Sequence, residues 1–184
     1  MQAAQNSPAL SVADYIIGEQ NSEVRHEYLG GVVYAMAGGS AEHNIISLNL
    51  AAALRSHLRG SQCQAFIADV KVRLQFAADD VFYYPDVMVA CDPRDTDRFF
   101  KRFPKVLIEV LSESTERIDR REKFLSYTRI DTLEEYVLVA QDRREVTVFR
   151  RDANWQPEAL KLAEHSLRLA SLEFTMPLSA VYEG

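Results

Sequence analysis

Cysteines and long apolar stretches are scarce in this chain of 184 residues. The two cysteines, Cys63 and Cys91, are too few for a disulfide scaffold or a four-cysteine zinc site, and fit small buried hydrophobic residues. No apolar run reaches the roughly 18 residues of a membrane span. The first twenty residues lack a basic start followed by an apolar stretch. We therefore expect no secretory signal and a soluble, cytoplasmic protein.

Positive charge is also in deficit, because 21 Lys and Arg stand against 27 Asp and Glu and give a formal net charge of −6. This balance excludes a protein that coats nucleic acid by bulk charge, but not a local basic groove. Hydrophobic residues make up 47% of the chain, which is ordinary for a globular protein. The length predicts one domain over residues 1–184, with residues 1–9 flexible.

The chain has no phosphate-cradling glycine loop, no dinucleotide-binding motif and no histidine metal motif. Hydrophobic periodicity instead predicts a mixture of helices and strands. The predicted helices cover 11–21, 40–59 and 114–129, and the predicted strands cover 25–36 (a hairpin), 64–76, 81–90, 105–111, 135–140 and 145–150, with weaker strands at 159–162 and 167–169. This order predicts an α/β (α+β) domain with a central mixed sheet flanked by helices.

Glu109 is a lone carboxylate in a nearly continuous apolar strand. A buried charge needs a partner, which can be a metal ion, an Arg or Lys, or a proton. Asp86 has a similar setting in the preceding strand, so the two carboxylates converge if these strands are neighbours. Mg²⁺ prefers such oxygen ligands, and the bound ion can activate water and stabilise a phosphate under attack. Alternatively, Asp86 is a turn residue and Glu109 pairs with a buried arginine in a structural or oligomeric protein.

The helix that follows has Glu116, Asp119, Lys123 and Tyr127 at helical spacing on one face. This face is either solvated, with an Asp119–Lys123 pair, or it points Lys123 at the carboxylates to stabilise developing negative charge. The same segment is locally basic and can line a groove for phosphate backbones, although such charge runs also occur in proteins that bind no nucleic acid. The basic residues of this groove are Arg117, Arg120, Arg121 and Arg129, together with Lys101, Arg102 and Lys105. We expect Arg120, Arg121 and Tyr127 to bind the substrate.

His43, near the edge of the apolar stripe of its helix, has two possible roles. It can act as an acid or base or order water near a metal, or it can simply pack at the helix edge. A cysteine hydrolase that uses His43 is a further alternative. However, no helix start lies where it could activate either thiol.

Several of these residues together resemble the Uma-two family, which is placed in the PD-(D/E)XK nuclease superfamily. The resemblance covers residues 10 to 150, and its combined pattern is specific. It is carried by Tyr84-Pro85-Asp86-Val87, Ile108-Glu109-Val110-Leu111-Ser112, Ser114-Thr115, Asp119, Lys123, Tyr127 and Glu135-Tyr136, with Glu27-Tyr28-Leu29-Gly30-Gly31 and His43 upstream.

The resemblance implies a restriction-endonuclease-like core built on a four-stranded mixed sheet. It implies that Asp86 and Glu109 are metal ligands, with the Val110 carbonyl as a further one, and that the ion is Mg²⁺ or Mn²⁺. This sequence departs from the superfamily at Leu111, where the usual lysine would share the face of Glu109. Lys123 is then the expected replacement, as in superfamily members whose lysine has migrated.

We therefore expect a metal-dependent endonuclease that hydrolyses phosphodiester bonds in DNA, with Asp86, Glu109, Lys123 and His43 as catalytic residues. We expect no membrane partner, and a homodimer because two strands must be cut. The alternative is a catalytically inactive nuclease fold that binds nucleic acid or a protein partner. The missing strand lysine and the net charge of −6 favour this alternative.

Overall fold

The computed structural model describes residues 9–76, 79–112 and 116–184. The helical elements are α1 (Val12–Gln20), α2 (Ala41–His57), α3 (Glu116–Ile118), the π-helical η1 (Asp119–Lys123), α4 (Phe124–Tyr127), the 3-10 helix η2 (Ala170–Leu172) and α5 (Leu178–Val181). The strands are β1 (His26–Leu29), β2 (Val32–Ala35), β3 (Gln64–Ile67), β4 (Lys71–Phe76), β5 (Asp79–Tyr83), β6 (Val87–Ala90), β7 (Phe100–Lys101), β8 (Pro104–Leu111), β9 (Glu135–Ala140), β10 (Val146–Arg150), β11 (Pro157–Leu160), β12 (Ser166–Leu169) and β13 (Phe174–Pro177). None of the described helices is long and apolar enough to cross a membrane.

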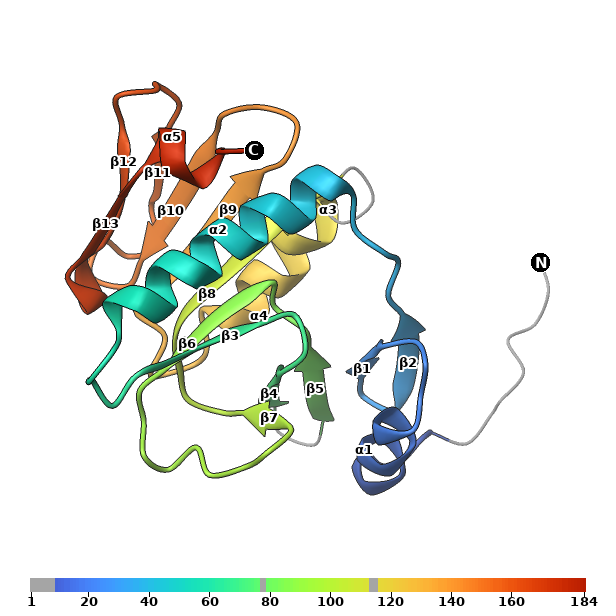
Figure 1. Cartoon of the computed structure of the whole chain (residues 1–184). Coiled ribbons are helices and arrows are strands. Elements are labelled where there is room, and N and C mark those ends of the chain that lie inside the picture. The colour runs from blue at the N-terminus through green and yellow to red at the C-terminus, as the bar shows by residue number, and fades with distance from the viewer. Residues whose placement is uncertain (1–8, 77–78, 113–115) are drawn as a thin grey trace.

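These strands form three sheets rather than the single sheet that we expected (Figure 1). The six-stranded sheet has the order β11-β10-β9-β8-β6-β3, and the five-stranded sheet has the order β2-β1-β5-β4-β7. A third sheet pairs β12 with β13. The six-stranded sheet is mixed, because β8 and β9 run parallel while its other pairs are antiparallel. The predicted class, a mixed sheet flanked by helices, is confirmed.

The expected strands over 64–76 and 81–90 are each divided between two sheets, which corrects that part of the prediction. β3 and β6 belong to the six-stranded sheet, whereas β4 and β5 belong to the five-stranded one. The second break falls at Pro85, which has no N–H to donate to a strand ladder. Asp79 and Asp80, which lie between the two predicted strands, belong to β5, and residues 77–78 lie outside the described ranges.

Helices cover both faces of the six-stranded sheet (Figure 1). Ile108 and Val110 of β8 belong to the apolar cluster that contains Leu50 and Leu54 of α2. Because side chains alternate along a strand, Glu109 points to the opposite face, towards η1 and α4. One buried strand therefore supplies both the core beneath α2 and a polar side chain on the other face.

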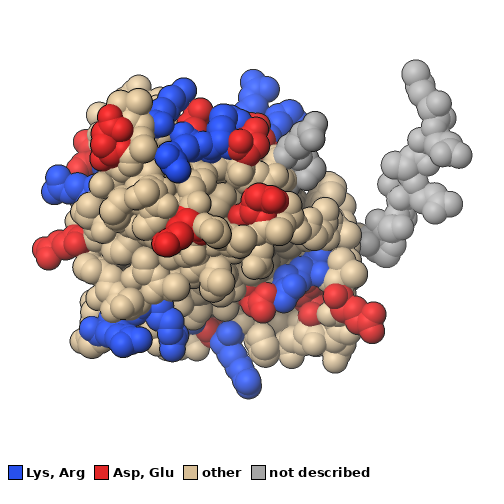
Figure 2. Space-filling model, turned by 45° about the horizontal axis from the view of Figure 1, so that its top comes forward, with Lys and Arg blue, Asp and Glu red and all other residues tan. Residues whose placement is uncertain are grey.

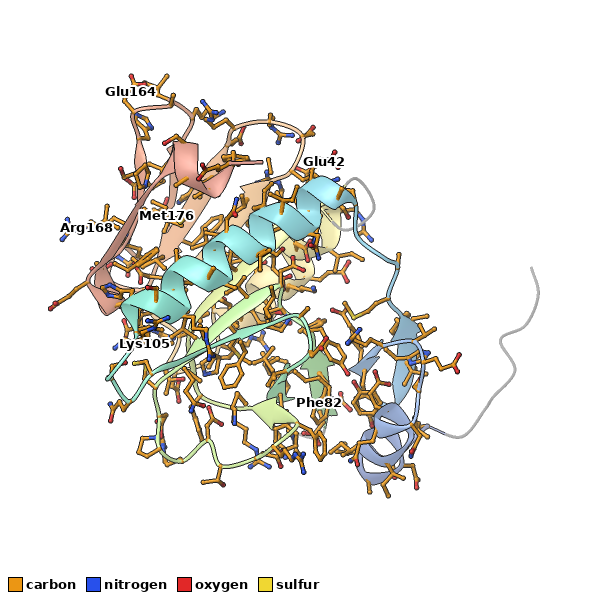
Figure 3. The ribbon with its side chains drawn as sticks, in the orientation of Figure 1. Glu42, Phe82, Lys105, Glu164, Arg168 and Met176 are labelled. Atoms are coloured by element: carbon orange, nitrogen blue, oxygen red, sulfur yellow. A yellow bond between two sulfur atoms is a disulfide. The ribbon has the colours of Figure 1, made fainter. Side chains whose placement is uncertain are left out.

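The N-terminal elements are attached to the five-stranded sheet by aromatic contacts. The rings of Tyr15 in α1 and Tyr28 in β1 lie 4.9 Å apart, and Phe82 of β5 lies 5.2 Å from Tyr15 (Figure 3). The predicted hairpin turn at Gly30-Gly31 is present, and both glycines have positive φ, which side-chain-bearing residues rarely adopt. This packing fixes β1 and with it the charged side chain of Glu27.

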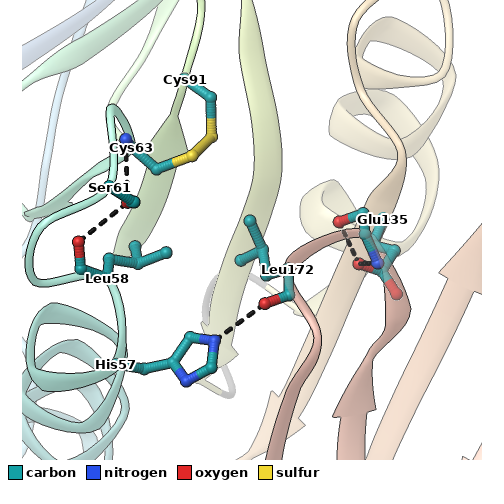
Figure 4. Close-up of a disulfide and its surroundings, with 8 residues drawn as sticks. His57, Leu58, Ser61, Cys63, Cys91, Glu135 and Leu172 are labelled. Carbon is teal, nitrogen blue, oxygen red and sulfur yellow. Dashed lines mark hydrogen bonds between the residues drawn. A yellow bond between two sulfur atoms is a disulfide. The ribbon is translucent and has the colours of Figure 1, made fainter.

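Cys63 and Cys91 form a disulfide, where we expected separate buried thiols (Figure 4). They stand next to Gln64 and Ala90, which face each other in the β3–β6 pair. Strand pairing thus brings the two sulfurs together, which their separation of 28 residues in sequence did not indicate. The bond joins the edge strand of the six-stranded sheet to the strand that follows Asp86.

Replacing Leu54 by alanine tests the packing of α2. The side chain is fully buried, so Leu54→Ala leaves a cavity and lowers the free energy of unfolding by about 2–5 kcal/mol in urea titrations. Leu48 lies on the same helix and is 56% exposed, so Leu48→Ala is the control and changes stability by less than about 1 kcal/mol. Equal losses in the two variants would contradict the assigned packing.

The disulfide predicts a measurable loss of stability on its removal. A double variant, Cys63→Ser with Cys91→Ser, lowers the free energy of unfolding by about 2–4 kcal/mol, since the unfolded chain regains the freedom of the closed loop. Wild-type protein in reducing buffer should show the same loss, and the double variant should not respond to reductant. An identical urea midpoint for wild type with and without reductant would overturn this expectation.

Candidate active site

Asp86 stands directly before β6, which pairs with β8, the strand that carries Glu109, so the strand neighbourhood on which the predicted convergence depends is present. Val87 of β6 pairs with Ile108 of β8 in antiparallel register, so Asp86 and Glu109 occupy the next opposing positions. Val87 and Ile108 both face the cluster beneath α2, so Glu109 projects on the other face, whereas Asp86 lies outside the ladder and its carboxylate reaches His43 of α2. The charge of Asp86 contributes to raising the pKa of Glu109, after the larger effect of burial.

Asp86 is held by groups from two elements. Its Oδ2 accepts a hydrogen bond from the Val110 N–H at 2.7 Å and lies 3.2 Å from His43 Nε2. The interaction with Asp86 raises the pKa of His43, although burial acts in the opposite direction. Ser40 caps α2 by accepting from the His43 N–H at 3.1 Å, which positions this histidine in the first turn. His43 is thus a direct partner of Asp86 rather than only a packing residue.

Lys123 stands at the centre of a buried ionic cluster. Its Nζ lies 3.2 Å from Glu109 Oε1, 3.2 Å from Asp119 Oδ1 and 3.1 Å from Glu27 Oε1. Asp119 and Lys123 are the first and last residues of η1, a π-helical turn of the kind that often occurs at functional sites. Lys123 therefore makes both the helical pair with Asp119 and the contact with Glu109 that the sequence left as alternatives.

One ammonium faces three carboxyl groups in this cluster, which is an excess of negative charge unless a carboxyl group takes up a proton. Burial by itself would lower the pKa of Lys123, but the charges of Glu109, Asp119 and Glu27 outweigh it and hold that pKa well above its usual value. Burial raises the pKa of Glu109. Among the described residues, Glu27 Oε1 and Asp119 Oδ1 are buried oxygens without a hydrogen bond, although both lie within ion-pair distance of Lys123. An additional cation at this site would relieve the excess.

Two buried tyrosines support this cluster, one through the Glu109 carboxylate and the other through the backbone of Asp119. Tyr127 donates its hydroxyl to Glu109 Oε1 at 2.9 Å, and Tyr136 donates to the main-chain carbonyl of Asp119 at 3.0 Å. Both side chains are fully buried. We expected Tyr127 to line a substrate groove, and this was wrong, because a fully buried ring that supports Glu109 has no surface for a substrate.

The basic residues of the same segment are partly neutralised. Arg120 Nε donates to Glu116 Oε1 at 2.8 Å, and Arg117 pairs with Glu122 at 3.0 Å, whereas Arg121 is exposed. Lys and Arg side chains gather along the upper edge of the face in Figure 2, with acidic side chains among them. Ser114 and Thr115, which contribute to the family pattern, lie outside the described residues.

Sequence reasoning did not assign Glu27 and Tyr136 to the site. Glu27 belongs to the family pattern, but nothing in its local spacing indicates that a hairpin of another sheet reaches Lys123. Tyr136 fits the apolar pattern of a buried strand, and only its hydroxyl group distinguishes it from the other residues of that strand. Asp119 was noted only as a helical partner of Lys123. A buried polar atom in an otherwise apolar strand was the available signal for Tyr136.

The donor set fits a hard cation that retains water ligands. No group of three or more His, Cys, Asp or Glu side chains in the described ranges is arranged to bind a metal unaided. Asp86 stands directly before β6 and Glu109 lies in β8, the strand that pairs with it, and the Val110 N–H donates to Asp86. Mg²⁺ is typically bound by one or two carboxylates together with water, so two carboxylates and a carbonyl suffice.

The fold is that of a nuclease-like class. A solved chain from Anabaena variabilis, described as "a putative nuclease belonging to DUF820", superposes with a TM-score of 0.72 at 16% identity, covering 88% of this chain and 91% of that chain. Two Synechocystis proteins are similar in sequence. The uncharacterized protein slr1290 is 34% identical over 180 residues, 96% of this chain and 93% of that protein, and the uncharacterized protein sll1609 is 33% identical over 144 residues, 77% and 80% respectively.

The particular family follows from a family model that matches residues 12–179 and is described as "Putative restriction endonuclease". The chain belongs to this family, Uma2, and the resemblance inferred from the sequence is confirmed.

Removing the Tyr127 hydroxyl tests the support of Glu109. Tyr127→Phe keeps the ring and deletes the hydrogen bond to a buried carboxylate, which lowers the free energy of unfolding by about 1.5–3 kcal/mol. Tyr34→Phe is the matched control, because Tyr34 is 54% exposed and should change stability by less than about 0.5 kcal/mol. Equal urea midpoints for wild type and Tyr127→Phe would argue against this hydrogen bond.

Proposed function

We propose that this protein is a metal-dependent endonuclease that hydrolyses phosphodiester bonds in DNA. The observation that carries the proposal is the position of Lys123, whose ammonium lies 3.2 Å from Glu109. Leu111 occupies the place of the strand lysine and is packed in an apolar cluster. Lys123 supplies a cation beside Glu109 from the next helical element, so the absence of the strand lysine does not deprive the site of positive charge.

Each residue of the site has a role in this proposal. Asp86 and Glu109, with the Val110 carbonyl, would hold Mg²⁺ or Mn²⁺, and such an ion supplies an activated water and stabilises the charge on the phosphate. Lys123 stabilises negative charge that develops at the phosphate, while Glu27 and Asp119 fix the direction of its ammonium. His43 holds the Asp86 carboxylate in place and can exchange a proton with water beside it.

The substrate and assembly are part of the same proposal. Arg120 and Arg121 stand on η1 next to the carboxylates and would contact the phosphate backbone, Arg121 directly because it is exposed. A homodimer would allow both strands of a duplex to be cut. The acidic net charge predicts binding that depends on these local contacts and on the metal rather than on bulk attraction.

The proposal is tested by DNA cleavage with Mg²⁺ or Mn²⁺. Asp86→Asn and Lys123→Met should each lower the rate by at least about 100-fold, because one removes a metal ligand and the other the charge that faces the phosphate. Matched controls are Asp142→Ala, whose side chain is 69% exposed, and Lys161→Ala, whose side chain is 61% exposed, and both should retain wild-type rates. Chelation of the metal should abolish cleavage by wild type.

Equal rates in wild type and Asp86→Asn would remove the assignment, and circular dichroism establishes that each variant is folded. If wild type binds DNA but cleaves none with either metal, the alternative of a catalytically inactive nuclease fold is favoured. The burial of Leu111 on the face of Glu109 is the observation on which that alternative depends.

A further inference from the structure

A surface hollow with a volume of about 270 Å³ lies away from the carboxylate cluster. Its walls come from β4, from the residues just before β8 and from the chain that follows α4. Phe103 at this hollow and Glu109 in the active site are six residues apart along an extended strand, which corresponds to about 20 Å. The two sites are therefore separate. The lining residues used here are Arg73, Phe76, Arg102, Phe103, Arg129 and Asp131.

Two of the three arginines in the hollow carry unneutralised charge. Arg73 is paired with Asp80 at 2.7 Å. Across the described part of the chain, the guanidinium groups of Arg102 and Arg129 form no ion pair with a carboxylate. Each instead lies over an aromatic ring, Arg129 over Phe76 at 5.2 Å and Arg102 over Phe100, which does not line the hollow, at 5.4 Å. The ring of Phe76 therefore holds the charge of Arg129 at the hollow without cancelling it.

The walls combine this charge with aromatic surface. Phe76 and Phe103 are half-buried and line the hollow beside the arginines. Asp131 adds one carboxylate, which can accept a hydrogen bond from a sugar hydroxyl or a base N–H. The volume stands near the lower limit for ligand pockets, about 300 Å³, so a small ligand fits better than a large one.

We infer that this hollow binds a nucleoside phosphate, with the phosphate at Arg102 and Arg129 and the base beside Phe76 and Phe103, whose rings lie under the guanidinium groups of Arg129 and Arg94. Guanidinium groups bind phosphate through paired hydrogen bonds, and aromatic side chains stack on bases of any sequence. An inorganic anion would leave the aromatic walls unused. A purely apolar ligand would leave the two guanidinium groups without a partner.

A phosphate joined to a nucleoside can come from two sources, a free mononucleotide and one residue of a nucleic-acid strand. Only the strand form rests on the proposed function, since a strand that crosses the active site could extend to this hollow. The mononucleotide form holds whether or not the protein cleaves DNA. The experiment therefore measures binding and not cleavage.

Binding is measured by calorimetry for AMP and by fluorescence anisotropy for a short single-stranded oligonucleotide, in metal-free buffer at fixed salt. The double variant Arg102→Ala with Arg129→Ala should weaken binding at least about tenfold, because both phosphate contacts are lost. Phe76→Leu should weaken AMP binding without a comparable effect on inorganic phosphate. Thermal unfolding shows whether each variant is folded.

The matched control for lost charge is Arg55→Ala with Arg59→Ala, two exposed arginines at the C-terminal end of α2 and beyond it, on the opposite side of the six-stranded sheet. This control should bind as wild type does. Weakening of both probes by the hollow variant supports a nucleotide site, and weakening of the oligonucleotide alone supports the strand form. The inference is overturned if the hollow variant and the control bind alike, or if inorganic phosphate competes as well as AMP. AMP binding by wild type in metal-free buffer does not depend on cleavage, so the loss of one without the other separates this inference from the proposed nuclease activity.

Discussion

The buried ammonium of Lys123 is the interaction on which the site depends. It lies within ion-pair distance of carboxylates from β1, β8 and η1, so it joins the five-stranded sheet, the six-stranded sheet and the helical segment at one point. Removing one member of a buried ionic cluster leaves charges without compensation, which is more costly than losing an exposed pair. The position of Glu109 is consequently determined by side chains from three parts of the chain, with Tyr127 as a fourth contact.

The strands predicted over 64–76 and 81–90 are divided between two sheets, and this division creates the place that Asp86 occupies. The chain leaves the five-stranded sheet after β5 and enters the six-stranded sheet at β6, and Pro85 lies in the connection. Asp86 therefore stands at the start of a strand, where the Val110 N–H and His43 can both reach its carboxylate.

Local patterns were sufficient to predict the helical regions before residue 130 and the hairpin, whereas the pairing of the strands near Asp86 and Glu109 was only a condition of the predicted site. Glu109 could be recognised from its own strand, since a charge in an apolar run requires a partner. Three features could not be predicted from the sequence, for physical reasons. The role of Glu27 depends on the docking of a distant hairpin, the disulfide depends on the register of β3 with β6, and the strand breaks depend on which sheet each half joins. Each is a long-range contact that short-range periodicity does not encode.

The cross-link between Cys63 and Cys91 encloses β3 to β6 in a covalent ring, and Asp86 lies within that ring. A single cut of the backbone inside the ring by a protease would therefore leave two pieces that stay connected through sulfur. The nicked molecule would keep Asp86 attached to the strand that faces Glu109 and would separate into fragments only after reduction. After such a cut, the oxidised chain thus keeps Asp86 in place, whereas the reduced chain does not hold the two fragments together.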